Sequence, residues 1–306
     1  MVKQVIPTAS DSLYALQKFY LRSPRFLGLS RKSQYDYEKN LEAALSTAVI
    51  GNTHLGSILI KDLRVMHVSN AYERWLEVGI RTANYRKAAL SVCWNYGMQK
   101  DIMLHNPIKH INTKSAKPRR VMWTEDQVKL FLTTAYSQWE WRSIGLVVHM
   151  AYEWAQRIGD MRLLKWDCLD LDAQRLDLEQ SKRNAAVHLP IGDGLASMLR
   201  TQQQDFGFQP YVAPRVKPRA GAYTPYDLDE INVLINQVKA AAGLPDELTA
   251  MDLRRTAITE MVEAGVDLAG VMQVSGHSNP QSVKPYMVNT FSGASAALAK
   301  RKGGKL

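Results

Sequence analysis

The stretch SGHSNPQSVKPYMVN, residues 275–289, decides how the rest of the chain is read. It contains His277 directly after a glycine, and Tyr286 follows nine positions later. A histidine and a tyrosine at this distance occur by chance in many proteins, so their meaning depends on residues upstream. Pro285 removes a backbone donor and interrupts any helix that starts at Pro280, so we expect Tyr286 on an irregular, movable segment.

Three upstream stretches add charged residues in a fixed order. AQRIGDMRLLKW places Arg157 and Asp160 at the junction of two expected helices. EQSKRNAAVHLPI places Lys182 and Arg183 in a tight turn between two expected strands. MDLRRTAITEMVEAG places Arg254 in the first turn of an amphipathic helix. Each cation alone is more often an ordinary surface residue, so the order of the set carries more information than any single member.

The hydrophobic pattern predicts mainly helices with one small sheet. Residues 9–110 follow the period of amphipathic helices, the first capped by Ser10 or Asp11. Thr124 with Gln127 three positions later forms a capping-box pattern at the start of a further helix. In CLDLDAQRLDLEQSKRNAAVHLPI the hydrophobic residues alternate instead, which predicts three short antiparallel strands.

Charge and cysteine content narrow the class of partner. The chain has 306 residues, which is enough for two ordinary domains. Its net charge of +10 suggests that its partner is a polyanion. Residues 1–120 hold 19 Lys and Arg against 8 Asp and Glu, whereas residues 121–306 hold 20 against 21. No apolar run is long enough to span a bilayer, and the N-terminus lacks the apolar core of a signal peptide. Cys93 and Cys168 give neither a disulfide framework nor a zinc pattern, which fits a reducing cytoplasm and favours nucleic acid.

A short basic segment, NTKSAKPRR over residues 112–120, separates the two parts of the chain. Its basic residues are Lys114, Lys117, Arg119 and Arg120. We expect this set, together with Arg183, to contact the phosphates of a nucleic acid. A solvated hinge without such contacts is the alternative.

In order and spacing, Arg157, Lys182, Arg254, His277 and Tyr286 resemble the tyrosine recombinase (phage integrase) family. The resemblance is strong where these residues lie and weak in the helical N-terminal part. It implies a mainly α fold with a small antiparallel β-sheet, arranged as a C-shaped clamp on DNA.

The resemblance also implies a division into domains. Residues 1–111 correspond to a helical, SAM-like core-binding domain, residues 112–120 to the linker, and residues 121–306 to a mixed α/β catalytic domain. Because the chain begins almost directly with the helical part, no separate arm-type DNA-binding domain is expected.

The chemistry that the resemblance implies explains the residue types. Tyr286 is the expected nucleophile, and forming its phenolate at pH 7 costs about 4 kcal/mol, so it needs nearby cations and a proton acceptor. Arg157 and Arg254 are expected to hold the phosphate oxygens with planar forks of donors, although Arg255 is an equally charged competitor of its neighbour. His277 is expected to add a hydrogen bond.

The other two expected members of the site act on protons and orientation. Lys182, on its turn, is the expected general acid for the 5′-hydroxyl leaving group. Asp160 is expected to orient the catalytic groups. No metal is needed, because side-chain cations take its place, and the sequence has no cluster with ligand spacing.

One position departs from the family. A histidine usually lies three residues before the second arginine, and Met251 stands there instead. A thioether does not accept a proton well, so Asp252, His277 or water must assist the removal of the proton from Tyr286. Met251 itself is expected only to pack.

The function implied is that of a site-specific recombinase or integrase, which cleaves and rejoins DNA through a 3′-phosphotyrosyl intermediate without metal, ATP or another cofactor. The expected partners are double-stranded DNA with specific recombination sites, further copies of the chain in a synaptic homotetramer and, optionally, accessory DNA-bending proteins, with no membrane. The expected setting is a mobile genetic element in the nucleoid and cytoplasm of a bacterial or archaeal cell. Two alternatives stay open: a non-catalytic DNA-binding protein whose site degenerated at Met251, and an activity like that of a type IB topoisomerase.

Overall fold

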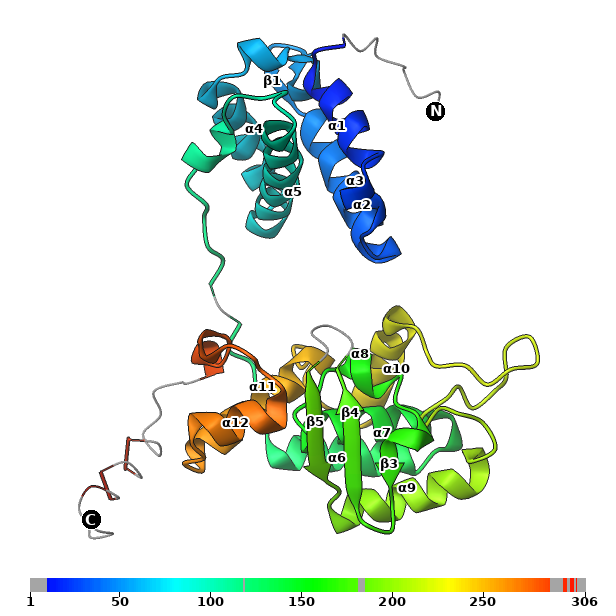
Figure 1. Ribbon diagram of the computed structural model, residues 1–306. Helices are drawn as coiled ribbons and strands as arrows, with labels where there is room; N and C mark the ends of the chain where they lie inside the picture. The colour runs from blue at the N-terminus through cyan, green and yellow to red at the C-terminus, as the bar shows by residue number, and fades with distance from the viewer. Residues whose placement is uncertain are drawn as a thin grey trace. The chain divides into compact units, whose positions relative to one another are not determined.

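The computed structural model describes residues 10–117, 119–180, 185–286, 294–295, 298–299 and 301. The chain divides into two compact units, Met1–Arg119 and Arg120–Leu306, and the boundary falls inside the basic segment. Each unit has its own hydrophobic core and is described by itself (Figure 1). Both are mainly helical, as the periodicity predicts.

The N-terminal unit consists of helices around one core, with a small hairpin. Its helices are α1 (Leu13–Leu21), α2 (Pro24–Leu27), α3 (Arg31–Leu45), α4 (Val65–Val78) and α5 (Ile80–Gln99). α5 packs against α1, α3 and α4, and Trp75 and Trp94 are fully buried between them. The hairpin of β1 (Ala48–Ile50) and β2 (Thr53–His54) was not predicted, because strands this short show no alternation.

The cap of the first helix lies one residue after Asp11 and two after Ser10, the two predicted caps. The backbone N–H of Ala15 donates to Ser12 Oγ at 3.3 Å, so Ser12 is the N-cap of α1. The Ser10 hydroxyl instead donates to the Asp11 carboxylate at 3.0 Å. Burial of Leu13 selects the start among three adjacent polar residues, and only packing could reveal this.

The C-terminal unit combines helices with a three-stranded sheet. Its helices are α6 (Glu125–Tyr136), α7 (Trp139–Glu153), α8 (Ile158–Met161), α9 (Asp193–Phe206), α10 (Leu228–Ala241), α11 (Ala250–Glu263) and α12 (Leu268–Ser275). Its strands β3 (Leu169–Asp170), β4 (Arg175–Glu179) and β5 (Ala186–Pro190) are antiparallel in that order. Thr124 and Gln127 form the predicted capping box at the start of α6.

The sheet buries one face, as its alternating sequence predicts. Leu176 pairs with Leu189, and both lie in the main core with Val187. The same core takes up Phe131 and Trp154 from the helices. β4 and β5 are thereby fixed against the core.

A second, smaller cluster fixes the segment that carries Tyr286. Its buried members are Ala155, Ala257, Ile258, Val271 and Val283. They come from α11, α12 and the segments after α7 and α12, and the ring of Tyr286 packs against them. Short 3₁₀ turns, Pro280–Ser282 and Lys284–Tyr286, replace a regular helix here.

Both ends of the connection between the units are anchored. The backbone N–H of Lys114 donates to the Tyr72 hydroxyl at 3.0 Å, and Asn84 donates to the Lys114 carbonyl at 2.9 Å. On the other side, the Trp123 indole donates to the carbonyl of Thr249, the N-cap of α11, at 3.0 Å. Within the described ranges, no helix combines the length and apolarity needed to cross a membrane.

Candidate active site

Arg254 lies at the centre of the candidate site. It projects from the first half of α11 and is only 8% exposed. Its guanidinium donates to the carbonyls of Ala155 and Ser275, both at 2.8 Å. Burial, followed by repulsion from Arg157, lowers its pKa to about 10, while interactions with Tyr286 and Asp160 oppose the shift. The group therefore stays charged at neutral pH and is held rigidly by backbone carbonyls.

Arg157 and Asp160 lie at the start of α8, as the sequence predicts. Arg157 is the N-cap residue, and its Nη1 lies 3.6 Å from Oδ2 of the buried Asp160. The same Nη1 donates to Gln180 Oε1 at 2.9 Å. Nη1 of Arg157 is thus occupied by contacts within the protein, and the other N–H groups of the guanidinium can donate to a phosphate oxygen.

His277 is held through both of its ring nitrogens, one by Arg254 and the other by Ser275. Nε2 lies 3.3 Å from Arg254 Nη2, and Nδ1 lies 2.7 Å from Ser275 Oγ. Because a guanidinium only donates, Nε2 must accept, and this assigns a neutral imidazole with its proton on Nδ1. Ser275 in turn donates to the Val271 carbonyl at 2.6 Å. In this arrangement the single lone pair of Nε2 accepts from Arg254.

Tyr286 completes the group of predicted residues. Its ring centroid lies 5.9 Å from that of His277. The guanidinium of Arg255 lies over the same ring, 5.6 Å from its centroid. The two adjacent arginines thus have different contacts. Arg254 is buried beside His277, and Arg255 lies over the ring of Tyr286.

Two buried glutamines belong to the site but were not found from the sequence. Gln180 and Gln156 are both fully buried, and the Gln180 amide donates to Gln156 Oε1 at 2.5 Å. Gln156 also donates to the carbonyls of Trp154 and Val274. The only available signal was their position in the sequence: Gln156 directly precedes Arg157, and Gln180 lies two residues before Lys182. A glutamine near a charged residue is too common to indicate a site.

Some predicted residues are not placed with this group. Lys182 and Arg183 lie outside the described residues, although Gln180 N–H donates to the Ala185 carbonyl at 2.9 Å at the base of their turn. The predicted linker contacts Lys114, Lys117, Arg119 and Arg120 are all exposed.

The structure narrows the candidates for the proton acceptor. Met251 is 83% exposed on the first turn of α11, so it does not pack as expected. Asp252 is buried, and its Oδ2 accepts from both the backbone and the hydroxyl of Thr249 at 2.9 and 2.7 Å. Oδ2 of that carboxylate is committed to the helix cap. His277, which lies beside the Tyr286 ring although its Nε2 accepts from Arg254, and water are the other two candidates.

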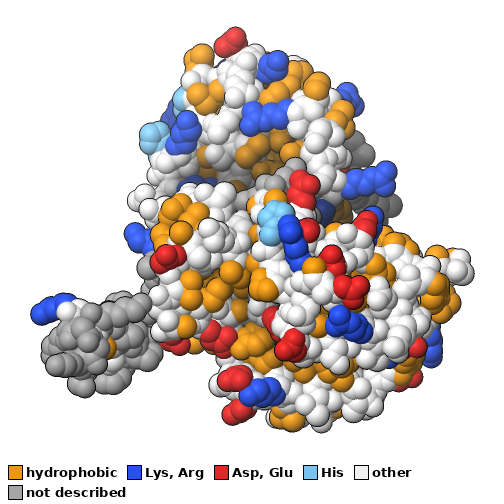
Figure 2. All heavy atoms as spheres, turned by 60° about the horizontal axis from the view of Figure 1, so that its bottom comes forward, with side chains coloured by type: hydrophobic (Ala, Val, Ile, Leu, Met, Phe, Trp, Pro, Cys, Tyr) orange, Lys and Arg blue, Asp and Glu red, His pale blue; other side chains and the backbone are white. Residues whose placement is uncertain are grey.

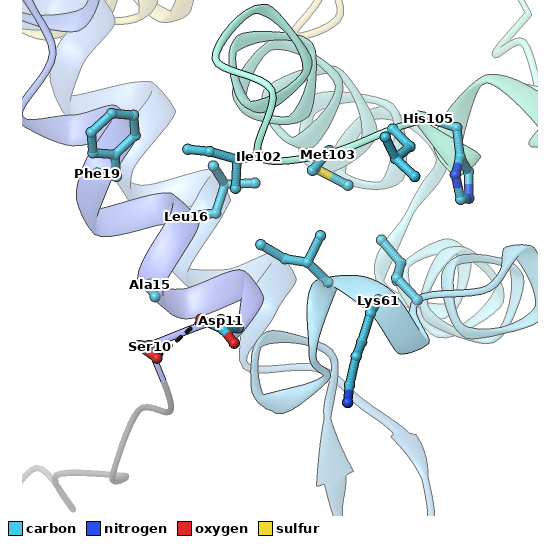
Figure 3. Close-up of a pocket in the computed structure, with 12 residues that line it drawn as sticks. Ser10, Asp11, Ala15, Leu16, Phe19, Lys61, Ile102, Met103 and His105 are labelled. Carbon is cyan, nitrogen blue, oxygen red and sulfur yellow. Dashed lines mark hydrogen bonds between the residues drawn. The ribbon is translucent and has the colours of Figure 1, made fainter.

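A hollow elsewhere in the chain contains none of these residues. On the face shown in Figure 2, basic and acidic side chains are interspersed with uncharged ones. A hollow of about 630 Å³ lies in the N-terminal unit, where Leu16 and Phe19 of α1 face Ile102 and Met103 (Figure 3). Its walls are mostly apolar, so it does not bring reactive groups together. In the part of the chain that the structure describes, no group of His, Cys, Asp and Glu could hold a metal ion.

Comparison with known proteins gives the family. Residues 120–292, more than half of the chain, match the model of the phage integrase family. The chain belongs to this family of tyrosine recombinases. The predicted enzyme class, which breaks and rejoins DNA strands, is thereby confirmed for this integrase-family protein.

Relatives and solved structures agree with that family. Tyrosine recombinase XerC of Bacillus pumilus is 22% identical over 235 residues, which cover 74% of this chain and 75% of that protein. The Tn1549 transposon integrase in complex with a circular intermediate DNA matches with a TM-score of 0.75 and 16% identity, over 95% of this chain and 100% of that one. A lambda integrase dimer bound to a COC′ core site matches with a TM-score of 0.71 and 17% identity, over 90% and 77%. These structures confirm the predicted fold of the integrase-family protein.

The exposed position of Met251 leads to a prediction. We expect Met251→His to raise the rate of DNA cleavage, but only by about tenfold or less, because water or another side chain already takes up part of this role in the wild type. A general base is typically worth about 10²–10⁴-fold where none exists. Single-turnover cleavage of a nicked site from pH 6 to 9 measures the gain, with Met251→Gln as a polar control that cannot titrate. A Met251→His variant slower than the wild type throughout this range would contradict the prediction.

Proposed function

We propose that this integrase-family enzyme is a site-specific DNA recombinase that uses Tyr286 as its nucleophile and needs neither metal nor ATP. One observation carries the proposal: Arg157, Arg254 and His277 are joined by hydrogen bonds and shared carbonyl acceptors beside the ring of Tyr286. Two guanidinium groups, a neutral imidazole and a phenol are the groups that phosphoryl transfer to a tyrosine requires.

The proposed step is balanced within the protein and the DNA. The Tyr286 oxygen forms a bond to phosphorus, the bond from phosphorus to the 5′ oxygen breaks, and a 3′-phosphotyrosyl link results. The phenolic proton passes to water or, if the Arg254 N–H leaves Nε2 for the phosphate, to His277 Nε2, and the leaving 5′ oxygen takes a proton from the proposed general acid, Lys182. Attack by the 5′-hydroxyl of a partner strand reverses the chemistry, so the energy of the phosphodiester bond is kept.

Arg157 and Arg254 have the proposed task of stabilising the pentacoordinate phosphate. Negative charge increases on its non-bridging oxygens in the transition state, and a buried cation stabilises such charge more than a solvated one does. Arg254 is held by two carbonyls before DNA arrives, so little reorganisation is needed. Asp160, close to Arg157, is proposed to orient that guanidinium.

The proposed assembly is a homotetramer bound to DNA. A lambda integrase tetramer bound to a Holliday junction matches this chain with a TM-score of 0.71, which supports the same arrangement here. The linker residues Lys114, Lys117, Arg119 and Arg120, with Arg183, are proposed to contact phosphates. Accessory DNA-bending proteins are a further, optional part of this proposal.

A covalent adduct tests the function. The purified protein is incubated with a library of nicked duplexes of randomised sequence, in which the short 5′-hydroxyl fragment diffuses away after cleavage and traps the enzyme. Adducts recovered under denaturing conditions would identify both the tyrosine and the DNA site. A protein that binds DNA without an adduct would instead be non-catalytic, and one that relaxes supercoiled DNA but exchanges no strands would act as a topoisomerase.

The charge of the N-terminal unit predicts how DNA binding responds to salt. Each phosphate neutralised adds about −0.9 to the slope of log K against log salt. We expect a steep slope for the wild type and a slope smaller by about 0.9 for Lys117→Gln, measured by fluorescence anisotropy. Lys129→Gln is the matched control, because Lys129 is exposed and already paired with Glu125 at 2.6 Å. Binding that hardly changes with salt would refute the phosphate contacts.

A further inference from the structure

The two arginines of the site are connected through one neutral side chain. Arg157 Nη1 donates to Gln180 Oε1 at 2.9 Å, and Gln180 Nε2 donates to the carbonyl of Ser275 at 3.0 Å. Arg254 Nη2 donates to the same carbonyl at 2.8 Å. A continuous path therefore leads from one guanidinium to the other, and Gln180 is its central member.

The connection through Gln180 holds together two guanidinium groups that repel each other. Arg157 is one of the causes that lower the pKa of Arg254. An amide can accept from a cation with its oxygen and donate to a carbonyl with its nitrogen, without adding charge. A carboxylate would only accept, and a hydrocarbon would do neither. Glutamine therefore fits a spacer between two cations that must share one phosphate.

The backbone around Gln180 is shaped to its side chain. Gly276 has a φ of +67°, and a Cβ at that position would lie 2.5 Å from the Gln180 amide nitrogen. A larger residue there would displace the glutamine as well as strain the turn. Gln180 itself is fully buried, so its geometry is set by the protein and not by solvent.

We propose that Gln180 is a positioning residue, which sets the separation of Arg157 and Arg254 and ties Arg157 to the segment that carries His277. This inference rests on the proposed function, because the separation matters only if both arginines act on one phosphate. Gln180 does not touch the reacting atoms, and its effect is exerted through Arg157. The backbone bond from Gln180 to Ala185 does not involve the side chain, so a side-chain variant can keep it.

The test is the rate of a single cleavage turnover together with the affinity for DNA. Gln180→Met keeps the length of the side chain and removes its hydrogen bonds. We expect the cleavage rate to fall about 10- to 100-fold, as misplacement of a catalytic group by about 1 Å does, with the dissociation constant for DNA changed by less than about threefold. Gln202→Met is the matched control: Gln202 is also fully buried and donates to Ser143 Oγ and the Val212 carbonyl. It should lose comparable thermal stability yet cleave at the wild-type rate.

A double-mutant cycle decides whether the effect passes through Arg157. In an Arg157→Ala background, Gln180→Met should change the remaining rate by less than about threefold. A further 10- to 100-fold loss in that background, or a wild-type rate in Gln180→Met alone, overturns the proposal. If Gln180→Met does not fold, Gln180→Glu replaces it in the double-mutant cycle, because a carboxylate cannot donate to the Ser275 carbonyl. We expect the same loss of rate in the wild-type background and the same small change in the Arg157→Ala background. A wild type that forms no adduct refutes the proposed function itself, and this is seen before any variant is compared.

Discussion

Tyr286→Phe should abolish the covalent adduct with DNA while leaving the affinity for DNA within about twofold of the wild type. Only the hydroxyl oxygen can form the bond to phosphorus, and no rate is left when the nucleophile is removed. The ring should keep its place, because it packs against the cluster of Ile258 and Val283 and lies beside His277. Denaturing electrophoresis of labelled, nicked DNA measures the adduct, and anisotropy measures the affinity.

The same chemical change at a neighbouring tyrosine provides the control. The Tyr152 hydroxyl donates to the Glu260 carboxylate at 2.9 Å, and its ring packs against the same cluster. Tyr152→Phe should therefore form the adduct at close to the wild-type rate, with some loss of thermal stability. An adduct that persists in Tyr286→Phe would assign the nucleophile to another residue, which peptide mapping of the adduct would then locate.

Arg254→Lys should lower the cleavage rate by about 10²–10³-fold, as the loss of a donor to a developing oxyanion does. Lysine keeps the charge but not the planar fork, so it cannot donate to Ala155 and Ser275 and at the same time reach a phosphate. Arg254→Ala should also reduce stability, because the buried Ala155 carbonyl loses its side-chain donor at a cost of about 1–3 kcal/mol, whereas the Ser275 carbonyl keeps the bond from Gln180. Single-turnover rates and thermal unfolding measure the two effects separately.

A buried arginine elsewhere in the unit controls for general damage. Arg142 is largely buried, pairs with Asp205 at 2.7 Å and stacks on the ring of Trp139. Arg142→Lys should reduce stability and leave the cleavage rate within about twofold. If Arg254→Lys cleaves at the wild-type rate, its guanidinium is structural only, and Arg255 over the Tyr286 ring becomes the better candidate for the phosphate.

The sequence by itself determined the residue types, their order and the local structures that carry them. The cap formed by Thr124 and Gln127, the alternating strands and the start of α11 depend on neighbours within a few positions, and such short-range patterns are visible in the chain. The family followed from the same order of residues. The hairpin β1–β2 was not predicted, because its strands are too short to show an alternating pattern.

Only the tertiary structure decided what these residues touch. Gln180 meets the Ser275 carbonyl across 95 positions of sequence, and Arg254 meets Ala155 across 99. It also separated Arg254 from Arg255, committed Asp252 to the cap of α11 and left Met251 exposed. Contacts at such separations depend on how helices and strands pack. Nothing in the sequence around Gln180 indicates that packing places its neutral amide between two arginines.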